Sequence, residues 1–169
     1  MAVTVSVYNQ AAALFAQGGI NASGTFTQPE TADTYKVKLY TNTTPPFTAA
    51  DVNMASLSGG TYTEVSTTGT GYSTLTLTGV TVTQSSNDAI LDANDASWTA
   101  GTSAIAATYA ILYRGSKTGD LIDRPLLHIN FGQLETAAPG TDFKIVWSAS
   151  GIFSFVVRSE ENTSELQSH

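Results

Sequence analysis

Apolar and polar residues alternate with a period of two along most of the chain after residue 33. Within residues 35–40, for example, Tyr35, Val37 and Leu39 are separated by lysines. Successive side chains of a strand point to opposite faces of a sheet, so this alternation predicts half-buried strands. The segments with strand character are residues 35–40, 72–83, 89–91, 96–99, 104–113, 126–131, 143–148 and 152–157.

The connections between these segments complete the prediction of the fold class. Turn residues recur about every ten residues and no helical pattern lies between the strands, so about eight or nine strands predict an all-β fold, an antiparallel β-sandwich or an open barrel. The apolar phase changes at Gly79, which predicts a β-bulge or bend there. Residues 152–157 follow a Ser-Gly turn and are expected to form a hairpin with residues 143–148.

The N-terminal segment is the one helix candidate. Its apolar residues fall at i, i+4, i+7 and i+8, and they are Val7, Ala11, Leu14 and Phe15. A helix of about twelve residues is marginal alone in water, so it must dock either on its own sheet or on a neighbouring subunit. We therefore expect three parts: residues 1–32 as a helix and connector arm, 33–157 as the β-sandwich domain, and 158–169 as a tail.

A long loop from Asn42 to about Gly60 is the second candidate for contacts with other molecules. An ordered loop of this length usually has a function or forms a contact surface. The helix and the start of the loop supply the expected assembly residues, which are Val7, Tyr8, Ala11, Leu14, Phe15, Pro45, Pro46 and Phe47.

Composition excludes several classes of function. The net charge is −7, and only seven Lys and Arg occur, scattered along the chain. Binding to nucleic acid requires a basic surface, so no nucleic-acid partner is expected. Cysteine is absent, which removes disulfides, thiolate metal sites and cysteine nucleophiles. No window approaches the roughly 18 apolar residues of a membrane span, so no membrane partner is expected.

Residues able to carry chemistry are few. His128 is the only histidine before the tail, and it falls on the polar phase of its strand, which predicts a surface or interface position. The densest group of oxygen-bearing side chains is Asp88, Asp92, Asn94 and Asp95. Such oxygens can bind Ca²⁺, but the spacing does not match an EF-hand loop, and Asp and Asn are common turn formers. We favour turns, and expect no cofactor and no enzymatic activity.

The aromatic residues are expected mainly in the core. Phe143, Ile145 and Trp147 share one strand phase, which predicts burial. Tyr72 and Trp98 are also expected in the core, although an exposed aromatic on a sheet could stack on a sugar ring. A carbohydrate-binding module is therefore an alternative function of another class.

The last twelve residues, RSEENTSELQSH, differ from the rest of the chain. Three of the fourteen acidic residues fall in this tail, directly after an apolar strand. The string resembles the translation of a widely used sequencing adapter, with Asn162 in place of a histidine. We expect residues 158–169 to be non-native, and their deletion to change neither folding nor assembly.

Over residues 1–157 the chain resembles a widespread family of small bacteriophage virion structural proteins. The motifs that carry the resemblance occur in the family's order: YN at 8–9, YKVKLY at 35–40, GTGY at 69–72, LTGVTVT at 77–83, LDAND at 91–95 with Trp98, YAILY at 109–113, INFG at 129–132, DFKIVW at 142–147 and GIF at 151–153. The chain departs from the family pattern at Ser73-Thr74, where a Gly-Gly pair is common, and near Arg114-Gly115, which is usually more acidic.

The resemblance implies a virion component and brings no catalytic residues. We expect a capsid decoration or cement protein on the exterior of the head, homo-oligomeric and bound to the major capsid protein or other virion proteins. A tail or head-fibre component is the alternative within this class. Localisation in the virion, after assembly in the host cytoplasm, follows from the same resemblance.

Overall fold

The computed structural model describes residues 3–9, 11, 34–44, 46–85, 88–115 and 123–156. Besides strands, the described residues include the short 3-10 helix η1 (Met54–Ser56). The described strands are β1 (Thr4–Val7), β2 (Thr34–Tyr40), β3 (Leu75–Thr76), β4 (Thr81–Ser85), β5 (Asp88–Asp92), β6 (Ala96–Thr99), β7 (Ile105–Gly115), β8 (Arg124–Ala137), β9 (Asp142–Ile145) and β10 (Phe153–Val156).

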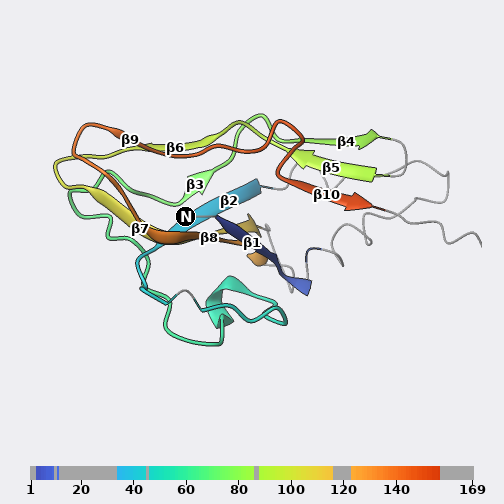
Figure 1. Cartoon of the computed structure of the whole chain (residues 1–169), viewed down its shortest axis with the longest axis horizontal. Coiled ribbons are helices and arrows are strands. Elements are labelled where there is room, and N and C mark those ends of the chain that lie inside the picture. The colour runs from blue at the N-terminus through green and yellow to red at the C-terminus, as the bar shows by residue number, and fades with distance from the viewer. Residues whose placement is uncertain are drawn as a thin grey trace, which may run out of the picture.

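These strands form three antiparallel sheets, so the predicted all-β class is confirmed. The large sheet has the order β1-β8-β7-β2-β3, and the smaller sheets have the orders β10-β5-β4 and β6-β9. Figure 1 shows both small sheets on one side of the large sheet and the loop that follows β2 on the other side. Within the described residues the end strands β1 and β3 do not pair with each other, so the large sheet is open.

The main core lies between the large sheet and the two small sheets. Val37, Leu39 and Leu112 project into it from the large sheet and are fully buried. Opposite them, Trp98 of β6 pairs in register with Phe143 of β9, and both are buried. The period-two alternation of the sequence therefore gives the expected core face of β2, β6 and β9.

A second, smaller core lies on the other face of the large sheet. Tyr8, Tyr40, Tyr109 and Ile111 are buried there, and Phe47, Met54, Leu57 and Tyr62 of the loop pack against them. Strand β7 is consequently buried on both faces from Ala107 to Tyr113. Strands covered on both sides lose the simple alternation of polar and apolar residues.

The structure corrects the expected start of the N-terminal helix. Val7 is the last residue of β1 and pairs with Leu127 of β8, so it does not belong to a helix. Helical geometry is found at Asn9 and Ala11, while Leu14 and Phe15 lie outside the described residues. The β-branched sequence of β1 favours a strand, and pairing with β8 outweighs the apolar periodicity of the segment.

The predicted continuous strand at residues 72–83 is wrong, although the position of the bend is right. Gly79 has φ +63° and separates β3, in the large sheet, from β4, in the three-stranded sheet. The backbone N–H of Leu77 donates to Tyr35 O at 2.8 Å, so contact with β2 continues almost to the bend. The chain changes sheets at Gly79 instead of forming a bulge within one strand.

The expected hairpin between residues 143–148 and 152–157 is also wrong. β10 pairs with β5, beginning next to the bond from the Ile152 N–H to Leu91 O at 2.8 Å. Residues 146–152 are too many for a tight two-residue hairpin and carry the chain from one small sheet to the other.

No helix in the described ranges is long and apolar enough to cross a membrane.

Candidate functional site

Polar contacts hold the loop between β2 and Glu64 at its base and in its middle. The Oδ1 atom of Asn42 accepts the Thr63 N–H at 2.6 Å, which closes the base of the loop. In its middle, the Asn9 N–H donates to Ala49 O at 2.9 Å and so joins the loop to the N-terminal segment. These bonds fix the loop as a cover over the second core.

Asp51 stabilises the fold of the loop from within. Its side chain is buried, and its carboxylate accepts the backbone N–H of Ser58 at 2.9 Å and the Ser58 hydroxyl at 2.6 Å. The backbone N–H of Met54, at the start of η1, donates to Asp123 O at 2.8 Å. A buried carboxylate satisfied in this way organises the loop and gives it no evident reactive group.

Six aromatic rings meet beneath this loop, and we call them the aromatic cluster. Tyr109 lies at its centre, stacked on Tyr40 at 4.9 Å and on His128 at 5.0 Å between ring centroids. Phe47 of the loop packs on His128 at 5.4 Å and on Tyr8 at 4.9 Å. Tyr62 completes the cluster, with its ring edge-on to Tyr40 and Tyr109.

His128 corrects the expectation of a surface histidine. It is only 3% exposed, and the rings of Phe47 and Tyr109 both pack against its ring. Its Nε2 atom has no hydrogen-bond partner among the described residues. Desolvation lowers the pKa of His128, and hydrogen bonding to the backbone, including that of Pro46, opposes this shift in part.

The tyrosines of the cluster are also kept neutral by burial. Desolvation raises the pKa of Tyr62 to about 12, with Asp51 nearby adding to the effect. The pKa values of Tyr8 and Tyr40 are raised further, mainly for the same reason. The cluster is therefore an uncharged, tightly stacked support for the loop at neutral pH.

The structure brings several of the expected assembly residues together, but within one chain. Tyr8 and Phe47 contact each other in the aromatic cluster, and Pro46 and Ala11 are buried. These residues hold the N-terminal segment and the loop on their own sheet. Of the other candidates, Val7 is 41% exposed, and Leu14, Phe15 and Pro45 lie outside the described residues.

The turn expected among the acidic candidates is not found, since residues 93–95 connect β5 to β6 without a turn. The side chains form hydrogen bonds around this connection instead. Asp92 Oδ1 accepts the N–H of Ala93 at 2.8 Å, and Asp95 Oδ1 accepts the N–H of Trp147 at 3.0 Å. Asn94 donates from Nδ2 to the Thr78 hydroxyl at 3.1 Å. The side chain of Asp88 is not described, and the described residues contain no group of three or more His, Asp and Glu side chains placed to hold a metal ion.

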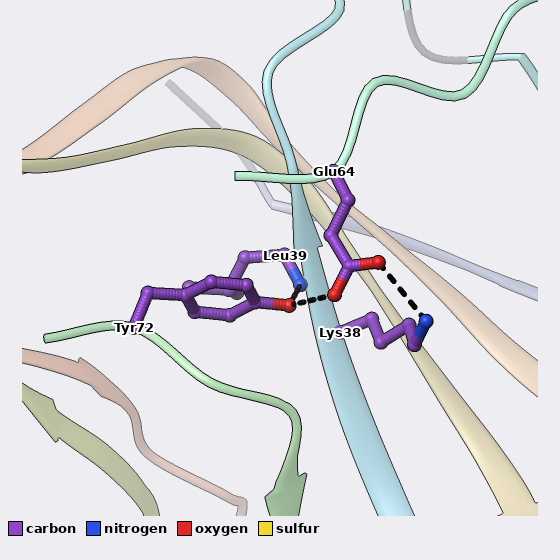
Figure 2. Close-up of polar contacts among 4 residues, drawn as sticks. All are labelled: Lys38, Leu39, Glu64 and Tyr72. Carbon is purple, nitrogen blue, oxygen red and sulfur yellow. Dashed lines mark hydrogen bonds and ion pairs between the residues drawn. The ribbon is translucent and has the colours of Figure 1, made fainter. Parts of the chain in front are cut away.

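A polar network around Tyr72 ties a long connection to the large sheet (Figure 2). The Tyr72 hydroxyl accepts the backbone N–H of Leu39 at 3.0 Å and donates to Glu64 Oε1 at 2.8 Å. Glu64 Oε2 forms an ion pair with Lys38 Nζ at 2.9 Å. Tyr72 and Trp98 are 2% and 4% exposed, which confirms their core positions and leaves neither ring free to stack on a sugar.

The aromatic cluster was missed at the level of sequence, although the chain contains a signal for it. Tyr40 and His128 stand on the phases assigned to solvent, although both are large rings and His128 has Leu126 on the same phase. Large residues on both phases of neighbouring strands indicate that both faces of the sheet are covered.

Comparison of this chain with protein-family models, with curated proteins and with solved structures found no match.

Proposed function

We propose that this protein is a non-enzymatic structural component of a bacteriophage particle, and that it decorates the exterior of the head as a cement protein. The observation that carries the proposal is where the motifs of the family resemblance fall. Several of their residues occupy buried core positions, such as Tyr8, Leu39, Leu112 and Phe143, and Gly71 occupies a tight turn, which is what a shared scaffold requires. The proposal therefore depends on the resemblance of residues 1–157 to virion structural proteins.

Gly71 and Tyr72 illustrate this use of the motifs. Gly71 has φ +72°, and a Cβ at this position would lie 2.5 Å from Thr99 O, so the turn requires glycine. Tyr72 follows directly and anchors the connection through its bond to Leu39. Trp98 donates from Nε1 to Ser73 O at 2.8 Å and fixes the same turn from the other side. The motifs at residues 35–40 and 69–72 and the motif residue Trp98 therefore contact one another at one place in the fold.

The architecture that we propose for the domain is a β-sandwich. The large sheet would form one layer, and the two small sheets would form the other. The shared main core, with Val37 and Leu112 on one side and Trp98 and Phe143 on the other, supports this description.

A decoration protein acts through many repeated copies. Weak contacts of each copy sum through multivalency, so no single large interface with the capsid is needed. The buried aromatic cluster supports such a role because Phe47, Met54, Leu57 and Tyr62 pack on it and hold the loop against the large sheet. The partner would be the major capsid protein, and the protein would be found in the virion after assembly in the host cytoplasm.

Electron microscopy of particles from the phage that encodes this chain tests the proposal. We expect copies of the domain in a regular lattice over the outside of the head. A stalk with distal density at the tail or at a head vertex would select the alternative of a tail or head-fibre component. Particles that contain no copy of the chain, by microscopy and by mass spectrometry, would overturn the proposal.

A carbohydrate-binding module is less well supported. It needs exposed aromatic rings, but Tyr72 and Trp98, the two candidates for sugar stacking, lie in the core. A glycan array probed with the isolated protein provides the test. Specific binding of a glycan would favour this alternative over a purely structural role.

A further inference from the structure

One side of the molecule presents two strand edges next to each other. β1 is an end strand of the large sheet, and β9 is an end strand of the two-stranded sheet, so each has a single described strand partner. Between them lies a groove of about 540 Å³. Its walls are mainly apolar and include Val3, Val5, Ile129, Phe143, Trp147 and Ile152.

The groove continues into an exposed apolar row on β1. Val5 pairs with Ile129 and Val7 pairs with Leu127, so these valines lie on the core face of the large sheet. Val3, Val5 and Val7 are nevertheless 57%, 56% and 41% exposed. The small sheets thus leave the outermost row of this face uncovered.

The edge of β1 lacks charge, proline and bulges, although at four residues the strand is short. Natural proteins protect edge strands with charged residues, proline or bulges. Residues 3–7 read VTVSV and contain no charge and no proline, and the register with β8 is regular. This edge is chemically suited to pairing with another strand.

Both open edges are complementary to themselves. In an antiparallel pair of two β1 strands centred on Val5, Val3 would face Val7 of the second copy, and Thr4 would face Ser6 of the second copy. All valines would then lie on one face and all hydroxyls on the other. Such self-complementarity is the property of an interface with twofold symmetry.

The charged residues of β9 are also self-complementary. In an antiparallel pair of two β9 strands centred on Phe143, Asp142 would face Lys144 of the second copy, and Lys144 would face Asp142 of the second copy. Within one chain these two side chains form an ion pair at 3.6 Å, and Asp142 Oδ1 accepts the Thr99 hydroxyl at 2.8 Å. Asp142 and Lys144 nevertheless remain 43% and 54% exposed at this edge. Glu135, the other charged residue of the groove, is held by Gln133 at 2.8 Å.

We infer that this open side is a twofold interface with a second copy of the chain, with β1 pairing with β1 and β9 pairing with β9. A chain of net charge −7 repels its own copies, so a contact between copies needs an uncharged or balanced surface. β1 carries no charge and β9 carries one of each sign. The inference does not depend on the proposed function, because the pairing can be measured on the purified chain in solution.

Sedimentation of the full chain over a range of concentrations is the first test. We expect a reversible dimer, and we expect Val5→Lys to weaken the dimer about tenfold or more, because it places two like charges opposite each other at the centre of the interface. Val52→Lys is the matched control, since Val52 is 50% exposed in the loop on the other face of the large sheet. A wild-type chain that stays monomeric up to millimolar concentration would overturn the inference, as would equal effects of the two variants.

A charge exchange on β9 tests the second strand pair. Lys144→Asp alone would place acidic side chains opposite each other and weaken the dimer. The double variant Asp142→Lys with Lys144→Asp restores opposite charges across the interface and is expected to recover association. Failure of the double variant to recover association, while it remains folded by circular dichroism, would contradict the pairing of β9 with β9.

Cross-linking keeps the inference testable if a charged variant fails to fold. The chain has no cysteine, so Val5→Cys and Val52→Cys each introduce a single thiol. Directly paired residues of antiparallel strands lie about 4.5–5.5 Å apart at Cα, within the range that a disulfide spans. We expect rapid oxidative dimerisation of Val5→Cys only. Equal rates for the two variants would mean that β1 does not meet β1, whether the edge is covered by another segment or left free.

Discussion

The Tyr72 hydroxyl lies 3.0 Å from the backbone nitrogen of Leu39 and accepts its hydrogen bond. Strand β3 pairs with β2 only at Lys36 and Val37, so the strand ladder does not reach Leu39 on that side. A side chain from the connection between Glu64 and β3 therefore completes the edge of β2. Figure 2 shows how Glu64 then joins Tyr72 and Lys38.

Removal of this hydroxyl should be costly. Tyr72→Phe leaves the buried N–H of Leu39 without its acceptor, and we expect a loss of about 1–3 kcal/mol in the free energy of unfolding. Tyr62→Phe is the control, because its hydroxyl donates to the exposed Ser58 O at 2.8 Å, where water can replace it. Denaturation in urea measures both variants. Equal losses would show that the contact with Leu39 has no special weight.

The two tryptophans should differ in their contribution to stability. Trp98 is 4% exposed and packs against Phe143 with ring centroids 6.2 Å apart, so Trp98→Ala is expected to cost about 3–5 kcal/mol. Trp147 lies beyond the end of β9 and is only partly buried, so Trp147→Ala should cost roughly 1–2 kcal/mol. Chemical denaturation of both variants tests the order, and a larger loss at Trp147 would contradict the assignment of the core.

Local sequence patterns predicted those strands that have one face in the core. β2 and β9 are found where Val37, Leu39 and Phe143 alternate with polar residues, because a strand with one covered face must show this period. The alternation of such strands depends only on neighbouring residues, so it can be recognised in the local sequence.

Features that depend on distant partners were not predictable in this way. β1 pairs with β8, more than a hundred residues later, and this pairing decides that Val7 is in a strand. The burial of His128 depends on a loop that returns to cover the sheet, which no local period reveals. The last strand was expected to pair with the edge of β9, but β10 pairs with the edge of β5. Each outcome is set by tertiary contacts that outweigh local preference.

The buried histidine should make stability depend on pH. Burial lowers the pKa of His128 below its ordinary value of about 6.5. As the pH falls below about 6.5, the unfolded chain binds a proton at this residue before the folded chain does, so the free energy of unfolding decreases until the folded pKa is reached. Above about pH 7 this contribution no longer changes with pH.

His128→Phe isolates this effect, since it keeps an aromatic ring in contact with Phe47 and Tyr109 but cannot titrate. We expect the stability difference between wild type and variant to shift against wild type as the pH is lowered from about 7.5 to about 5. Urea denaturation at several pH values measures this difference. Parallel stability curves for the two proteins would mean that His128 titrates equally in the folded and unfolded states.

The N-terminal segment should stabilise its own domain. Tyr8 is fully buried, its N–H donates to Leu126 O at 3.0 Å, and its ring packs on Phe47. Tyr8→Ala is expected to cost about 3 kcal/mol or more in the free energy of unfolding, independently of protein concentration. Val3→Ala, on the exposed part of the same segment, should change stability by less than about 0.5 kcal/mol. A loss at Tyr8 that appears only when the protein associates would instead indicate an arm exchanged between subunits.

Two glycines, Gly71 and Gly140, have nearly the same backbone angle but different surroundings. Alanine substitutions at the two positions therefore distinguish the cost of conformational strain from the cost of steric conflict. Gly71 and Gly140 have φ +72° and +77°, so alanine at either site incurs the cost of the left-handed conformation, about 1–2 kcal/mol. At Gly140 a Cβ would meet no atom within 4 Å, whereas at Gly71 it would lie 2.5 Å from Thr99 O and 3.0 Å from the backbone nitrogen of Gly101. Backbone atoms of this turn cannot rotate away, because Gly101 N–H is bonded to Thr70 O at 2.7 Å.

Gly71→Ala should therefore lower the free energy of unfolding by at least about 2 kcal/mol more than Gly140→Ala does. It should also loosen the Tyr72 anchor, because the two residues are adjacent. Urea denaturation gives the two energies, and hydrogen exchange at the Leu39 amide reports on the anchor. We expect faster exchange at that amide in Gly71→Ala and unchanged exchange in Gly140→Ala. Equal destabilisation by the two substitutions would show that the turn at Gly71 relaxes freely, and that its contact with residues 99–101 does not constrain the framework.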